Sequence, residues 1–90
     1  MTNSPRRRSD VNARLLEGEM VVLDRKADLV HHLNQTASFI WQRCDGHSTR
    51  QDIADQLVET FEIDPDTARA SVTVTLQQFD ELGLLDRTLQ

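Results

Sequence analysis

The sequence predicts an α+β fold in which a three-stranded antiparallel sheet is followed by three α-helices. Short apolar runs fill the first third of the chain, which is typical of strands. In the remaining two thirds, apolar residues recur every three or four positions, which is typical of amphipathic helices. Residues that favour helix starts and ends divide this second part into three segments.

The first third contains three short strand patterns. Residues 11–15 alternate apolar and polar side chains, which predicts a half-buried strand. The pair Glu17-Gly18 predicts a tight turn, and the apolar run 20–23 predicts the second strand. After a charged loop, residues 29–33 predict the third strand. Because three strands alone are marginally stable, we expect the helices to cover one face of the sheet.

Capping residues delimit the helices. Asn34 can accept a hydrogen bond from the first turn of the first helix, and either Ser48 or Thr49 can open the second. Asp64-Pro65 predicts the start of the third helix, which ends before Gly83. The apolar faces predict the core, with Ala37, Ile40, Trp41 and Cys44 from the first helix, Ile53, Ala54, Leu57, Val58 and Phe61 from the second, and Ala68, Val72, Leu76 and Phe79 from the third.

The chain has 90 residues, which is the size of one domain. We expect residues 1–10 to form a disordered basic tail, because they are polar and carry Arg6, Arg7 and Arg8, and residues 11–90 to form the domain. Residues 10–90 hold seven basic and fifteen acidic side chains, a net charge of −8. No apolar run is long enough to cross a bilayer, and one cysteine makes no internal disulfide. We therefore expect a cytoplasmic protein without a membrane partner.

The sequence carries no strong catalytic, metal or cofactor signal. No glycine-rich phosphate-binding motif is present. Cys44 and His47 supply two soft ligands where a structural zinc site needs four, and Cys44 lies on an apolar helix face that predicts low reactivity. We therefore expect a protein that is not an enzyme and that has neither a metal nor a cofactor.

Strands followed by three helices also describe a winged helix-turn-helix, so a DNA-binding transcriptional regulator is the alternative function. The predicted second helix, residues 50–62, holds one base and four acids, and the third, residues 65–82, holds one base and three acids. Binding to DNA draws much of its affinity from neutralised phosphates. The charge therefore disfavours nucleic acid as a partner, although the shape permits it.

The pairs Leu33-Asn34 and Asp45-Gly46, the aromatic first helix, and Gly83-Leu84-Leu85 together resemble the PqqD family, with the likeness covering about residues 11–85. The resemblance implies a winged-helix-like recognition domain that holds the leader of a ribosomally made precursor peptide while a modifying enzyme acts on it. In that family the enzyme is a radical SAM protein in cofactor (PQQ) biosynthesis or a protease in lasso-peptide pathways, and a cyclase is a further candidate here. The precursor and the pathway are left open, and the chain is expected to be a monomer or a homodimer.

The resemblance also implies where the leader binds, namely beside the third strand as an added strand and against the third helix. Arg69 could pair with an acidic leader residue or with Asp66, and Val72 and Leu76 could belong to the core instead. If a histidine of the third strand contacts the leader, binding weakens on acidification. The candidate peptide-binding residues are Leu29, Val30, His31, His32, Leu33, Arg69, Val72, Thr73 and Leu76.

Overall fold

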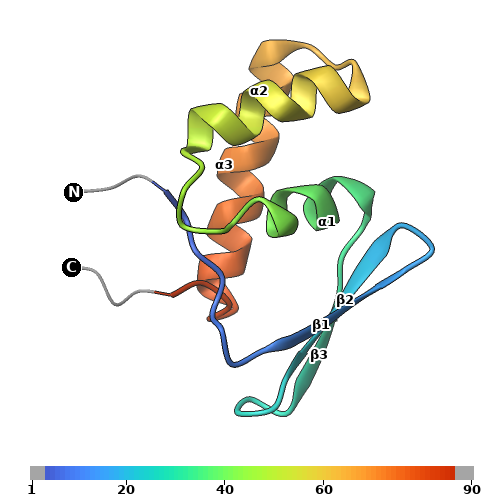
Figure 1. Ribbon diagram of the computed structural model, residues 1–90, viewed down its shortest axis with the longest axis vertical. Coiled ribbons are helices and arrows are strands. Elements are labelled where there is room, and N and C mark those ends of the chain that lie inside the picture. The colour runs from blue at the N-terminus through green and yellow to red at the C-terminus, as the bar shows by residue number, and fades with distance from the viewer. Residues whose placement is uncertain (1–3, 87–90) are drawn as a thin grey trace.

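The computed structural model describes residues 4–86 and confirms the predicted fold of three antiparallel strands followed by three helices (Figure 1). The strands are β1 (Asn12–Leu16), β2 (Glu19–Asp24) and β3 (Leu29–His32), and the helices are α1 (Gln35–Gln42), α2 (Arg50–Phe61) and α3 (Pro65–Glu81).

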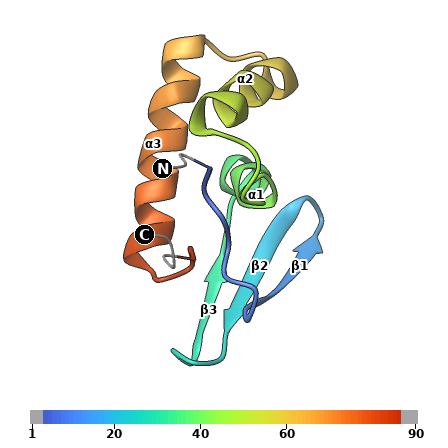
Figure 2. The same ribbon diagram turned by 60° about the vertical axis from the view of Figure 1, so that its left-hand side comes forward.

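The sheet has the strand order β1-β2-β3, so β1 and β3 form its two edges. Burial alternates along β2, where Met20, Val22 and Asp24 face the helices and the intervening residues face outward. All five residues of β1 are exposed, which differs from the half-buried strand that the sequence predicts. β1 is the edge strand on the side of the sheet away from α3 and pairs only with β2, so few of its side chains have a partner layer to pack against (Figure 2).

The predicted caps start and end the helices. The Asn34 side chain accepts from the Ala37 amide, and Thr49 and Asp52 form a reciprocal capping box at α2. After α3, Gly83 has a φ of 74°, a left-handed conformation that glycine adopts without strain. This conformation lets the Leu84 amide bond back to the Phe79 carbonyl at 2.9 Å, and Leu84 is thereby buried.

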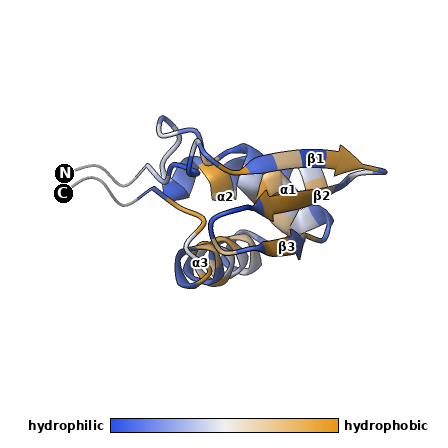
Figure 3. Cartoon of the chain, turned by 90° about the horizontal axis from the view of Figure 1, so that it is seen from below, coloured by the Kyte–Doolittle hydropathy of each residue, from blue (hydrophilic) through white to orange (hydrophobic). Residues whose placement is uncertain are grey.

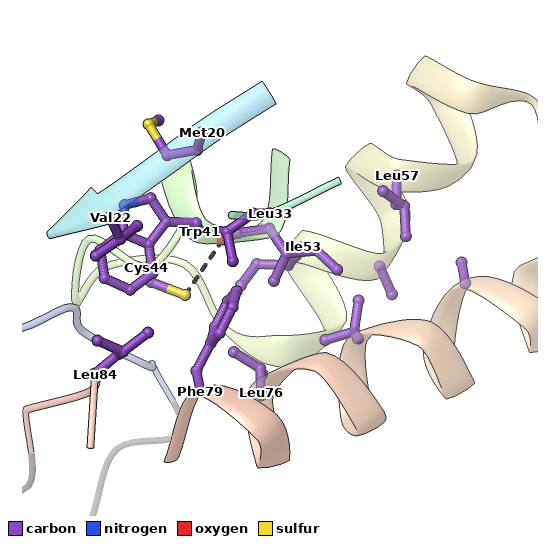
Figure 4. Close-up of a cluster of buried hydrophobic side chains, with 14 residues drawn as sticks. Met20, Val22, Leu33, Trp41, Cys44, Ile53, Leu57, Leu76, Phe79 and Leu84 are labelled. Atoms are coloured by element: carbon purple, nitrogen blue, oxygen red, sulfur yellow. Dashed lines mark hydrogen bonds between the residues drawn. The ribbon is translucent and has the colours of Figure 1, made fainter. Parts of the chain in front are cut away.

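The core lies between the sheet and the three helices (Figure 4). Trp41 is 2 % exposed and meets Phe79 edge to face, with 5.4 Å between the ring centroids. Val22 of β2 and Ile53 of α2 are fully buried in the same cluster. Trp41 therefore joins α1 to α3 and the sheet, as expected for the largest side chain of a small core.

Residues 5–10, here called the N-terminal arm, make ordered contacts with two later segments. The Arg7 amide donates to the Cys44 carbonyl at 2.9 Å and the Arg8 amide donates to the Leu84 carbonyl at 3.0 Å. The Pro5 carbonyl accepts from Gly46. The disorder predicted for residues 1–10 is therefore corrected for the arm, since composition does not reveal these backbone pairings. Residues 1–3 lie outside the described part of the chain, and the domain boundary at residue 10 stays a prediction.

The side chains of the arm also bind the domain. The Arg7 guanidinium donates to the carbonyls of Trp41, Gln42 and Cys44 at 3.1–3.3 Å, and so it caps the C-terminal end of α1. A Cβ at Gly46 would come within 2.9 Å of the Arg6 side chain, so glycine leaves room for the arm there. Two of the arginines that look like a free basic tail therefore hold helix ends, Arg7 at α1 and Arg8 through the Gly83 carbonyl after α3.

Candidate functional site: the free edge of β3

The backbone of β3 is hydrogen-bonded on one side and unpaired on the other. The Leu33 amide donates to the Met20 carbonyl at 2.8 Å. Backbone groups alternate in direction along a strand, so Leu29 and His31 also direct theirs toward β2. The amides and carbonyls of Val30 and His32 therefore point to the opposite edge. Within residues 4–86, no strand or isolated bridge pairs with this edge. An extended segment can complete those unpaired groups.

The side chains of β3 alternate between the two faces of the sheet. Leu29 and His31 share the face of the buried Asp24 and Val22, whereas Val30 and His32 lie on the uncovered face. Val30 is 65 % exposed, and His32 pairs with Glu19 across the sheet at 3.5 Å. Leu33 is buried, and its carbonyl accepts from the Ser38 hydroxyl. Leu33 therefore anchors the strand to the core rather than presenting a free group.

Helix α3 lies on the β3 side of the sheet (Figures 2 and 3). No Cα atom of β3 comes within 8 Å of one in α3. An added strand lies about 4.8 Å from its neighbour, so a segment paired with β3 would lie between that strand and α3.

The four helix residues predicted to bind peptide differ in exposure. Val72 and Leu76 are each 1 % exposed and belong to the core. Membership of the core is the alternative that the sequence analysis gave for these two residues. Arg69 and Thr73 are exposed, and the Arg69 guanidinium forms an ion pair with Asp66 one turn earlier. A role of these residues in peptide binding stays a prediction.

Two exposed apolar residues of α3 were missed by the sequence reasoning. Val74 is 54 % exposed and Leu82, which ends the helix, is 43 % exposed. With Gln78 they form a row at intervals of four residues. At 100° per residue, Leu82 lies about 180° around the helix from Thr73. In the sequence, Val74 and Leu82 can be recognised as apolar residues that lie outside the apolar stripe that predicts the core.

A buried ion pair fixes the connection that leads into β3. Asp24 is 2 % exposed, its carboxylate meets the Arg8 guanidinium at 3.0 Å, and it accepts from the Ala27 amide at 3.3 Å. Burial acts to raise the pKa of Asp24, but the Ala27 amide and Arg8 outweigh it and hold that pKa below its ordinary value. The charged form is therefore the one that the fold stabilises, and the N-terminal arm thereby positions the start of β3.

The other candidates for a reactive site among residues 4–86 are the Cys44 thiol and groups of metal-ligating side chains. Cys44 is fully buried and its thiol donates to the Ile40 carbonyl (Figure 4). Burial raises the pKa of Cys44 to about 12, so the nucleophilic thiolate is not populated near neutral pH. Within residues 4–86, no group of three or more His, Cys, Asp or Glu side chains could hold a metal ion. In the same residues, no helix is long and apolar enough to cross a bilayer.

A shallow pocket of about 190 Å³ lies at the other edge of the sheet. Leu15 of β1, Phe39 of α1 and Phe61 at the end of α2 supply its apolar walls. Phe39 meets Phe61 edge to face at 5.6 Å, and the Arg43 guanidinium lies over the Phe39 ring. The pocket is therefore separate from the unpaired edge of β3.

Comparison with known proteins agrees with this architecture. Three solved structures superpose on most of the chain. A lasso peptide synthetase B1 complexed with its leader peptide has a TM-score of 0.81 at 24 % identity and covers 92 % of this chain and 98 % of its own. TbiB1 in complex with the TbiA(beta) leader peptide has a TM-score of 0.83 at 18 % identity, with 94 % and 99 % covered. The PqqD part of Methylobacterium extorquens PqqCD, described as a stand-alone RiPP recognition element, has a TM-score of 0.75 at 26 % identity, with 92 % and 88 % covered.

Among curated protein sequences, none matches this chain significantly. The sequence profile of the family described as coenzyme PQQ synthesis protein D matches residues 19–85, from the start of β2 to the segment after α3. Because this match spans most of the chain, the protein belongs to the PqqD family.

Proposed function

We propose that this protein is a non-catalytic adaptor that binds the leader of a ribosomally synthesised precursor peptide and presents it to a modifying enzyme. The unpaired edge of β3 is the observation that carries the proposal, because its backbone groups suit an extended peptide of varied sequence. Two structures of the same fold are complexes with leader peptides, which supports the same mode of use.

The leader pairs with the outward backbone groups of Val30 and His32 and runs along α3. Exposed apolar side chains on both elements, Leu29 of β3 and Val74 and Leu82 of α3, bury area against it. Backbone pairing supplies affinity without regard to sequence, whereas the side chains on the two elements supply selectivity.

The modifying enzyme is a radical SAM protein, a protease or a cyclase, and the adaptor itself contributes no reacting group. Precursor and enzyme meet in the cytoplasm, where the precursor is synthesised. The alternative of DNA binding is not proposed, because α2 and α3 expose Asp52, Asp55, Glu59 and Asp66, which repel a phosphate backbone.

The test uses ¹⁵N-labelled protein and synthetic peptides from short reading frames that neighbour its own. We expect one peptide to shift the amide resonances of residues 29–33 and of α3, while the amides of α2 stay unchanged. Shifts confined to the β1 edge or to the pocket of Leu15, Phe39 and Phe61 would overturn the assignment of the leader to β3.

A further inference from the structure

His31 holds an unsatisfied buried nitrogen at the edge where the leader is proposed to bind. Its Nε2 atom is closed off from solvent and has no hydrogen-bond partner, although the residue as a whole is half-buried. Most buried polar side-chain atoms are hydrogen-bonded, so a buried orphan is a feature that calls for an explanation.

The fold itself does not use this nitrogen. Polar side chains nearby have partners of their own, since Ser38 bridges the Met20 amide and the Leu33 carbonyl, and Asp24 pairs with Arg8. Metal binding does not account for it either, because the described residues offer no cluster of ligands. An apolar side chain would fill the same position without leaving a polar atom unpaired.

The position of His31 suits contact with an added strand. Its register partner is the fully buried Val22, so its side chain lies on the inner face of the sheet, between those of Leu29 and Leu33. A segment that pairs with the outward groups of Val30 and His32 places alternate side chains on this inner face. Side chains opposite one another on paired strands have Cβ atoms about 4.5–5.5 Å apart, which is within reach of an imidazole.

We propose that His31 selects a leader residue with an uncharged hydrogen-bonding side chain, a hydroxyl or a carboxamide, at the position opposite it. This proposal rests on the proposed function and specifies the class of leader. A neutral imidazole has one donor and one acceptor nitrogen, and a hydroxyl or a carboxamide can satisfy either. Rotation of the ring about the Cβ–Cγ bond, which is broad in histidine, brings Nε2 to the leader.

A charged leader side chain does not suit this position. Leu29 and Leu33 flank His31 along the strand, and Val22 lies beside it on β2, so a charge placed there would lose hydration without an ionic partner. The net charge of −8 on residues 10–90 adds a general repulsion toward carboxylates of the leader. An apolar leader side chain would bury Nε2 without pairing it.

The test selects binders from a random peptide library displayed on phage, with the whole chain as bait. We expect the wild-type binders to share Ser, Thr, Tyr, Asn or Gln at one position, and the binders of His31→Phe to share an apolar residue there. The matched control is His47→Phe, which makes the same change at an exposed histidine between α1 and α2 and should select the wild-type pattern.

Pairs of synthetic peptides, one with the polar side chain and one with its apolar analogue, then measure the preference for the polar side chain. Replacing the selected side chain by its apolar analogue (Thr by Val, or Gln by Leu) should weaken binding to the wild type about tenfold and leave binding to His31→Phe unchanged within about twofold. The imidazole ¹⁵N resonance of His31 should shift when the polar peptide binds and should not shift with the analogue.

The outcomes separate the two proposals. A library that yields no binder, or binders that shift no resonance of β3, would sink the proposed function. Binders that contact β3 but show the same preference with wild type and with His31→Phe would overturn the role of His31 alone.

Discussion

Two of the places in residues 4–86 where an extended segment can pair are used in opposite ways. Between Cys44–Gly46 and Leu84–Asp86, the pairing site is filled by the N-terminal arm of the same chain. At β3, the outward groups of Val30 and His32 have no partner among residues 4–86. Backbone pairing thus serves stability at the first site and is left for a ligand at the second.

Occupation of the first site by the arm bears on the unpaired edge of β3. An unpaired edge invites self-association, and an extended segment such as the N-terminal arm is the kind of segment that could cover it. The arm is instead held by Arg7 on the carbonyls at the end of α1 and by Arg8 on Asp24. Held at these positions, the arm does not pair with β3.

Deleting residues 1–9 should give the largest effect. The deletion removes four backbone hydrogen bonds between the arm and residues 44–46 and 84–86. At about 0.5–1.5 kcal/mol for each bond, the free energy of unfolding should fall by about 2–6 kcal/mol. Urea denaturation followed by circular dichroism measures it.

The matched control is Arg6→Ala, which alters an exposed side chain and keeps the backbone pairing. We expect the control to unfold close to the wild type. A truncated chain as stable as the wild type would mean that the filled pairing site contributes nothing to the fold.

The next effect distinguishes the two sides of β3. Val30→Pro removes an amide that points to the open edge, where proline is tolerated. We expect the fold to persist and leader affinity, measured by calorimetry, to fall about tenfold, since one backbone bond is lost and the proline ring crowds the incoming strand.

His31→Pro removes an amide that points to β2 instead. It should lower the free energy of unfolding by about 1–3 kcal/mol, because the Val22 carbonyl is left unpaired inside the sheet. Equal losses of stability from the two prolines would contradict the assignment of the free edge.

The two flanks of α3 can be compared in the same way. Because Thr73 and Leu82 lie on opposite sides of the helix, one added strand can contact only one of the rows that contain them. Exposed apolar area favours the row of Val74 and Leu82, so Val74→Ser should weaken leader binding about threefold to fivefold. If Thr73→Ala weakens binding and Val74→Ser does not, the leader lies on the flank that the sequence predicted.

The sequence predicts the elements because their signals are local. Asn34, Thr49 and Asp64 cap helices with their own side chains, and Gly83 ends α3 through its own φ. Core residues such as Trp41 and Phe79 follow from helical period alone. For the same reason the resemblance to the family was visible in short segments.

The arm and the choice of flank could not be predicted in this way. Whether Arg7 is a free charge or a cap for α1 depends on residues more than thirty positions away. Likewise, the helical period of α3 shows which residues lie outside the core stripe, but it does not show which of the exposed flanks faces β3. The orphan nitrogen of His31 is a property of packing that no local pattern encodes.

The smallest expected effect at neutral pH concerns the acidic carboxylates that pair with the arm and the pH below which they stop stabilising the fold. The pKa of Asp24 lies below its ordinary value, and that of Asp10 is lowered as well by Arg8 and then by Lys26. An unfolded aspartate has a pKa of about 3.9, so between that pH and the lower folded values the unfolded chain binds more protons than the folded one. Stability from these carboxylates is therefore complete above about pH 5 and is lost as the pH falls below about 4.

Asp24→Asn tests this account. The variant should be less stable than the wild type at pH 7, and the difference should shrink as the pH falls from about 5 to 2, because the wild-type carboxylate becomes neutral. Urea midpoints across that range measure the difference. In an Arg8→Gln background the same substitution should cost less, since the ion pair is already absent. Wild type and Asp24→Asn with parallel acid profiles would mean that the ion pair of Arg8 and Asp24 does not help to hold the arm.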